Sequence, residues 1–368
     1  ATERSENGGI HEVTWNVKVL DASKDGEVVK FTLQTKTEND PREEKGVIVL
    51  RDYDDFEWLN HCLTTQNKVD YVVIPPLPPR PVVTATASEA KSKKQLGKDA
   101  KTMVADEFTK DCRSLEKFLH LILVHPAFKK DGILEKFLIE QEAPVRTKVK
   151  KGLFGGLGKT VDEMRYQGYK DRDEDFQKYR DFVDKELVAI KEANMDLQRH
   201  FWRLWTCKEC NRAFNIFSSA LTSDKYWTCI FTVSLYFFLQ DSYDVMSTND
   251  DNTLGFTVDL YSRYMESAKE MLFRRTCKLV EFENAVKALE KAKPQKKEQC
   301  ESVKDEAETA YNNITELAAI EMKRFNHQRV LAIQSSLTNY AESRIKNGRD
   351  TYAILAKLLN DVRKLGDS

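Results

Sequence analysis

The sequence predicts an α+β module in the first part of the chain and an all-α region of three long helices after it. Two observations support this division. Short segments with alternating apolar residues, which are typical of half-buried strands, fall before residue 51, and seven-residue apolar repeats fill much of the chain after residue 165. The 368 residues are enough for two or three domains with cores of their own.

Three strands are expected at the beginning of the module. Residues 13–20, "VTWNVKVL", alternate apolar and polar side chains, residues 28–35 alternate again, and "GVIVL" at 46–50 is the third candidate. Asp25-Gly26 lies between the first two and is typical of a hairpin turn. The pattern therefore predicts a small antiparallel sheet.

Helices should follow this sheet. Asp54 is the expected N-cap of the first, with Glu57 as its capping-box partner. "IPPLPPRP" at 74–81 can continue neither a ladder nor a helix, so we expect an extended loop. Apolar residues at helical spacing predict two further amphipathic helices, one from Phe108 to Ile122 and one from Leu134 to Leu138.

The order of these elements resembles the phox-homology (PX) domain of sorting nexins. The residues that carry the resemblance are "RDYDDFEWL" at 51–59, "IPPLPP" at 74–79 and "HPAF" at 125–128. It implies a PX domain over residues 10–142, preceded by a flexible N-terminus at 1–9. An alternative for "PPLPPRP" is a polyproline ligand of SH3-type modules.

The resemblance also implies a lipid pocket, which is degenerate in this chain. In family members that bind a 3-phosphorylated inositide, an arginine before the motif's aromatic residue grips the phosphate. Here Asp52 precedes Tyr53, Asp111 stands at the second basic position, and Arg113 is displaced by two residues. A carboxylate a few ångströms from a phosphate is unfavourable by roughly 4 kcal/mol at an effective dielectric constant near 20. We therefore expect Arg51, Tyr53 and Arg113 to form a pocket that does not hold this lipid in the usual way.

The altered pocket is similar to that of the sorting nexin 5/6/32 branch, whose PX domains contact proteins. Phe108 and Glu116 match the branch's partner groove, whereas Val104 replaces a bulky aromatic residue. The resemblance thus implies that cargo tails bind by adding a strand at the sheet edge.

Residues 143–164 are expected to form an amphipathic connector. Wound as a helix, it would present an apolar stripe for membrane insertion beside basic residues. The stripe is Leu153, Phe154, Leu157 and Val161, and the basic residues are Lys148, Lys150, Lys151 and Lys159. Four glycines disfavour a helix in water, so folding is expected only on the bilayer; a flexible linker is the alternative.

Three long helices are predicted after the connector. The first carries a heptad series of Phe176, Val183, Ile190, Leu197 and Leu204. The second, from about Tyr226, is interrupted by the polar "STNDDNT" at 247–253 and stops at Pro294; the third spans about 296–365. The expected apolar positions of the third are Val303, Ala310, Leu317, Val330, Leu337, Leu355 and Val362. Helices near 100 Å long must dimerise to bury such stripes.

Three long helices after a PX-like module resemble a BAR domain, here residues 165–368, which forms a curved antiparallel dimer. The stretch "LFRRTCKLVEFENAVKALEKAK" carries this resemblance. It implies an endosomal coat or adaptor protein that acts on membrane curvature and retrograde cargo sorting toward the Golgi. Lys291, Lys293, Lys296 and Lys297 would contact anionic lipid at the dimer tips. Implied partners are a sorting nexin 1/2-type heterodimer partner or a second copy, cargo receptor tails and dynactin.

Composition excludes other classes. The net charge of −1 gives no global field for nucleic acid, and seven scattered cysteines indicate a reducing compartment. Residues 1–9 lack a secretory signal, and the apolar run Tyr226–Leu239 is too short to span a bilayer. The Cys207/Cys210 pair has no second pair, "GLFGGLG" lacks the ending of a P-loop, and no carboxylate pair, serine triad or metal motif appears, so no metal, cofactor or enzymatic activity is predicted. The resemblance to PX-BAR sorting nexins implies a location on the cytoplasmic face of early endosomes. The alternatives are a true phosphatidylinositol 3-phosphate reader and a cytoskeletal coiled-coil linker.

Overall fold

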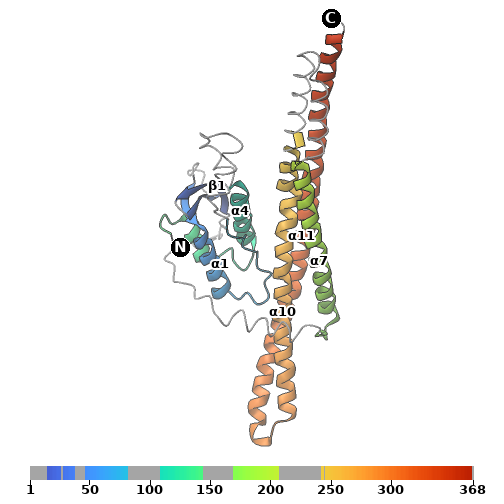
Figure 1. Ribbon diagram of the computed structural model, residues 1–368. Coiled ribbons are helices and arrows are strands. Elements are labelled where there is room, and N and C mark those ends of the chain that lie inside the picture. Colours follow the sequence, from blue (N-terminus) through green and yellow to red (C-terminus); the bar gives the residue numbers. More distant parts are fainter. Residues whose placement is uncertain are drawn as a thin grey trace, which may run out of the picture. The chain divides into compact units, whose positions relative to one another are not determined.

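A computed structural model gives the fold of the chain (Figure 1). The structure describes residues 15–25, 28–37, 46–81, 108–143, 169–206, 242–243 and 245–366. The chain divides into two compact units, Ala1–Tyr169 and Lys170–Ser368. None of the helices within the described ranges has a stretch both long and apolar enough to cross a membrane.

The first unit contains an antiparallel sheet in the order β1-β2-β3, with β1 at Trp15–Asp25, β2 at Val28–Thr37 and β3 at Val47–Asp52. Asp25 pairs with Val28, which leaves two residues for the connection, as expected of a hairpin. These results confirm the three predicted strands. A β-bulge between Val19 and Asp21 shifts the register in β1.

Three helices bury the inward face of this sheet: α1 (Tyr53–Gln66), α4 (Thr109–Val124) and α5 (Gly132–Ile139). Phe56 of α1 lies edge-on between Phe31 of β2 and Phe137 of α5, at ring-centroid distances of 6.1 and 5.1 Å. All three rings are at most 1% exposed, which makes this stack the centre of the core. Residues 74–81 have no regular secondary structure, as the prolines predict.

The described part of the second unit contains three long helices: α7 (Glu174–Thr206), α10 (Phe256–Glu290) and α11 (Lys297–Gly366). In Figure 1, α10 and α11 run alongside each other to a hairpin that contains a short 3-10 turn at Pro294–Lys296. At 1.5 Å per residue, the 70 residues of α11 extend for about 105 Å. The predicted three-helix region and its break at Pro294 are confirmed.

The core of the second unit lies where α10 packs against both other helices. Tyr264 of α10 lies edge-on against Phe325 of α11, with ring centroids 5.0 Å apart. Phe176 and Val183, the first two members of the predicted heptad series, are 3% and 1% exposed. Farther along α7, Ile190 and Leu197 are only half-buried, so one chain covers only the beginning of this stripe.

Arg275 of α10 connects all three helices through a buried polar network. Its guanidinium is 1% exposed and lies 2.5 Å from a carboxylate oxygen of Asp171, just before α7. It also donates hydrogen bonds to Tyr311 and Thr315 of α11, at 3.0 and 3.2 Å, and lies 3.7 Å from the ring centre of Phe176. A buried charge is tolerated because its donors find partners.

Two local predictions were wrong. Asp52, not Asp54, is the N-cap of α1, with Asp55 as its capping-box partner. The polar stretch 247–253 does not interrupt the second helix, because residues 245–250 are α-helical and continue into a π-helix at Asp251–Gly255. Within one chain, the face of α11 that packs inside is Ile314, Ala318, Met322 and Phe325, and the apolar residues expected at a dimer contact, Val303, Leu317, Val330, Leu337 and Leu355, are exposed.

Candidate functional site

The expected lipid pocket begins where β3 ends and α1 starts. The Asp52 carboxylate accepts a hydrogen bond from the Asp55 backbone N–H at 3.0 Å, and the Asp55 carboxylate accepts one from the Asp52 N–H at 2.8 Å. These reciprocal bonds satisfy backbone donors at the first turn of α1. The acid before the motif's aromatic residue therefore has a structural role in this chain.

Tyr53 is held between α1 and the proline loop. Its hydroxyl donates to the Pro78 carbonyl at 2.5 Å, and the Arg80 guanidinium lies 4.7 Å from its ring centre. Arg80 in turn donates to Asp54 and, at 2.9 Å, to Glu57. We call this arrangement of Tyr53, Arg80, Asp54 and Glu57 the Arg80 clasp.

The clasp borders a small hollow of about 90 Å³. Its lining residues are Val28, Val29, Asp52, Tyr53, Asp54, Arg80 and Pro81. Two carboxylates and one guanidinium are thus the charged groups of the lining, and Glu57 adds a third carboxylate through Arg80. The hollow carries a net negative charge, which opposes a phosphorylated ligand.

Arg51 is not among the residues that line this hollow. Its side chain points into the core, where Nε donates to the Phe137 carbonyl at 3.1 Å, other guanidinium nitrogens donate to the Leu50 and Glu140 carbonyls, and the residue is 1% exposed. Burial lowers the pKa of Arg51, while the charges of Asp55 and Glu140 act against this shift. Arg51 fastens the end of β3 to α5 and does not line the hollow.

Of the three expected pocket residues, the structure brings only Tyr53 to the hollow. Arg113 is exposed on α4 and is not among the lining residues. Sequence reasoning missed Arg80, although its place at the end of the proline loop, 27 positions after Tyr53, was a usable signal. The missed contact joins residues distant in sequence, which a local pattern does not reveal.

The expected partner groove lies beside the open edge of β1. The Glu116 carboxylate accepts a hydrogen bond from the Val19 backbone N–H at 2.9 Å, and His120 Nε2 lies 2.7 Å from the Val17 carbonyl oxygen. Both side chains come from α4, so this helix occupies backbone groups that an added strand would use. Phe108, at the N-cap of α4, is 3% exposed and belongs to the core.

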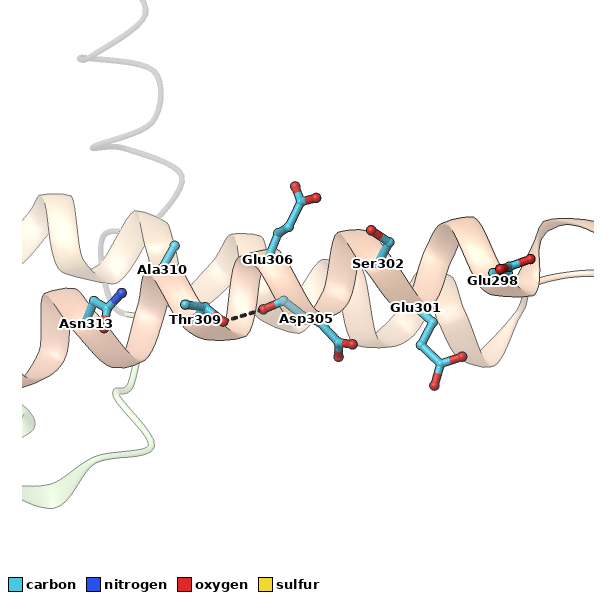
Figure 2. Close-up of a pocket in the computed structure, with 8 residues that line it drawn as sticks. All are labelled: Glu298, Glu301, Ser302, Asp305, Glu306, Thr309, Ala310 and Asn313. Atoms are coloured by element: carbon cyan, nitrogen blue, oxygen red, sulfur yellow. Dashed lines mark hydrogen bonds between the residues drawn. The ribbon is translucent and has the colours of Figure 1, made fainter.

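The hairpin between α10 and α11 carries basic residues in and beside its connection and acidic residues on the first turns of α11. Lys291, Lys293, Lys296 and Lys297 are all exposed. The first turns of α11 are acidic, as Figure 2 shows. This shallow surface is lined by Glu298, Glu301, Ser302, Asp305, Glu306, Thr309, Ala310 and Asn313.

The remaining expected membrane-contact residues lie outside the described residues. They are Leu153, Phe154, Leu157, Val161, Lys148, Lys150, Lys151 and Lys159 of the connector. The pair Cys207 and Cys210 and the apolar run Tyr226–Leu239 also lie outside.

Comparisons with known proteins agree with this architecture. Residues 41–141 match the family model for the PX domain. Sorting nexin-6 of Homo sapiens is 28% identical, with 93% of this chain and 90% of the relative covered; sorting nexin-32 of Mus musculus is 25% identical, with 93% and 91% covered. The cryo-EM structure of the SNX-BAR Mvp1 tetramer has the same fold, at a TM-score of 0.57 and 14% identity over 93% of this chain and 99% of that one. The matches along nearly the whole chain, together with the sheet, the proline loop and the three long helices, support a PX-BAR sorting nexin that is most similar to the sorting nexin 5/6/32 branch.

Proposed function

We propose that this chain is a membrane coat or adaptor protein of endosomes, whose PX module binds proteins in place of phosphatidylinositol 3-phosphate. Sorting nexins of this family are peripheral endosomal proteins that act on curved membranes, and they are adaptors without enzymatic activity. The finer proposal adds retrograde endosome-to-Golgi sorting at the early endosome. It also divides the chain into a PX domain at 10–142, an amphipathic connector at 143–164 and a BAR domain at 165–368. The Arg80 clasp is the observation that supports the loss of phosphatidylinositol 3-phosphate binding by the PX module.

The clasp opposes a phosphoinositide in two ways. A guanidinium already lies over the Tyr53 ring and is bonded to two carboxylates, so a phosphate would have to compete with Asp54 and Glu57 for it. Asp52 also lines the hollow, and a carboxylate about 4 Å from a phosphate costs about 4 kcal/mol at an effective dielectric constant of 20. The competition for Arg80 and the repulsion by Asp52 both weaken phosphoinositide binding.

Vesicle sedimentation tests this part of the proposal. Vesicles of phosphatidylcholine with 20% phosphatidylserine, with and without phosphatidylinositol 3-phosphate, should sediment the full chain to a similar extent. The alternative, a true reader of this lipid, predicts a strong gain with the lipid that Arg80→Ala abolishes. That result would refute the proposal.

The tip lysines are proposed to contact anionic lipid. Each basic residue near an anionic leaflet contributes on the order of 1 kcal/mol, and the acidic face of α11 should point away from the bilayer. Lys293→Gln with Lys296→Gln should weaken sedimentation on phosphatidylserine vesicles several-fold. A control with the same charge change, Ser302→Glu with Thr309→Glu on the acidic face, should have little effect (Figure 2). Equal losses in the two variants would contradict a contact made by the loop lysines.

Dimerisation is proposed to cover the exposed apolar stripe of α11. Leu317, Leu331, Ile345, Tyr352 and Leu359 are all at least 39% exposed and are separated by multiples of seven residues. A seven-residue spacing keeps side chains on one side of a long helix that packs against another. The partner is a second copy or a sorting nexin 1/2-type protein.

Sedimentation equilibrium of the full chain tests the stripe. Leu331→Glu with Ile345→Glu should convert dimers to monomers, whereas the exposed polar control Asn339→Glu should leave the mass unchanged. A dimer that survives the double substitution would place the seam elsewhere.

Cargo binding is proposed at the β1 edge, next to Glu116; Phe108, the other residue of the expected groove, is buried at the start of α4. An extended cargo tail that adds a strand there would exchange backbone hydrogen bonds with residues 17–19 and displace the Glu116 and His120 side chains. Dynactin is a further proposed partner. The connector is proposed to insert into the bilayer through its apolar stripe, as the sequence predicts.

A further inference from the structure

We propose that the hollow beside Tyr53 is a binding site for a cationic side chain, an arginine or lysine of a partner protein, and that Arg80 is its intramolecular occupant. This inference rests on the proposed protein-binding role of the PX module. It adds the chemical class of the ligand at this site.

The side chains around the hollow match a guanidinium. A cation within about 6 Å of an aromatic ring centre is attracted by the ring face, and the Arg80 guanidinium lies 4.7 Å from that of Tyr53. Asp54 and Glu57 each accept a hydrogen bond from its NH2 nitrogen. Ring and carboxylates together provide the stacking and charge-assisted bonds that favour arginine.

The aromatic ring is fixed before any partner arrives. Tyr53 is 8% exposed, and its hydroxyl is bonded to the Pro78 carbonyl, so the ring does not have to reorient on binding. Asp52 lines the same hollow and is itself held by the cap of α1. A site whose ring and Asp52 carboxylate are already held in place loses less conformational entropy when it binds.

The present occupant can be replaced. The side chains of Arg80 and Asp54 are 53% and 49% exposed, and residues 74–81 that carry Arg80 have no helix or strand to hold them. Arg80 therefore acts as a tethered competitor whose effective concentration is set by a short loop. An arginine on a protein that already contacts this module would be tethered as well, and could displace Arg80.

Saturation-transfer NMR on the full chain tests the site with a defined probe, N-acetylarginine amide. N-acetylcitrulline amide has the same shape without the charge and is the control ligand. Removal of the tethered competitor in Arg80→Ala should lower the Kd for the arginine probe at least tenfold relative to the unaltered chain. Asp54→Asn with Glu57→Gln in the Arg80→Ala background should reverse this gain, and the citrulline control should bind the Arg80→Ala variant at least tenfold more weakly than the arginine probe does.

The outcomes separate this inference from the proposed function. Equal binding of arginine and citrulline, or no response to Arg80→Ala in a chain whose circular dichroism is unchanged, would overturn the cation site and leave the lipid proposal standing. Inositol 1,3-bisphosphate serves as the second probe. If it binds the unaltered chain and Arg80→Ala abolishes this binding, Arg80 is a phosphate ligand, and both proposals are refuted.

Discussion

Asp171→Ala should destabilise the three-helix unit far more than the loss of an exposed ion pair. Asp171 is the carboxylate nearest to Arg275, and both side chains are at most 1% exposed. Removing one member of a buried pair typically costs about 3–5 kcal/mol, because the other charge stays buried without its partner. Asp173, 3.8 Å from the same guanidinium, offsets part of this loss, so we expect about 3 kcal/mol.

Urea denaturation followed by circular dichroism at 222 nm measures this cost. Protein concentration is held constant, because dimerisation is linked to stability. The matched control is Asp184→Ala, which removes an ion pair with Lys269 whose two side chains are each 57% exposed. This control should cost less than about 1 kcal/mol.

A double-mutant cycle separates the ion pair from the packing of the two side chains. Asp171→Ala with Arg275→Met removes both charges. The double variant should therefore lose less free energy of unfolding than the two single variants lose in total, by at least about 1 kcal/mol. Additive losses, or an Asp171→Ala cost equal to that of Asp184→Ala, would refute the reasoning.

Three further predictions concern the PX unit. Glu116→Ala should speed hydrogen exchange of the Val19 amide at least about tenfold, because that N–H loses its acceptor; unchanged exchange would show that Glu116 does not protect the edge. Burial, followed by the charge of Asp111, raises the pKa of the Cys112 thiol to about 11 from 9.0. The folded state therefore disfavours the thiolate, so the unfolding free energy should fall as pH rises from 9 to 11, and Cys112→Ala should flatten this dependence. Gly46→Ala should cost more than about 1 kcal/mol in urea denaturation, since φ is 64° and a Cβ would lie 2.5 Å from the Thr35 carbonyl oxygen. Gly348→Ala, with open space at its Cβ inside α11, should instead gain up to about 1 kcal/mol; equal effects would contradict the steric argument.

The elements of both units follow from local sequence pattern. Alternation through Phe31 and Leu33 predicts β2, the prolines of 74–81 predict an extended loop, and Pro294 predicts the end of the second helix. Each of these features depends on residues within a few positions of one another, whose periodicity or missing N–H acts wherever the segment lies. The resemblance of short motifs then predicts the family.

Tertiary structure alone decided which charges meet and which helical stripe is covered. Asp52 and Asp54 are both acceptable caps in sequence, but β3 pairs as far as Asp52, so α1 starts directly after it. Arg80 reaches Tyr53, and Arg275 reaches Asp171, across long stretches of chain. On α11 the apolar residues form more than one stripe, and contact with α10 buries the one through Met322 and Phe325. Coulomb and packing energies depend on distances in space, and the fold sets those distances.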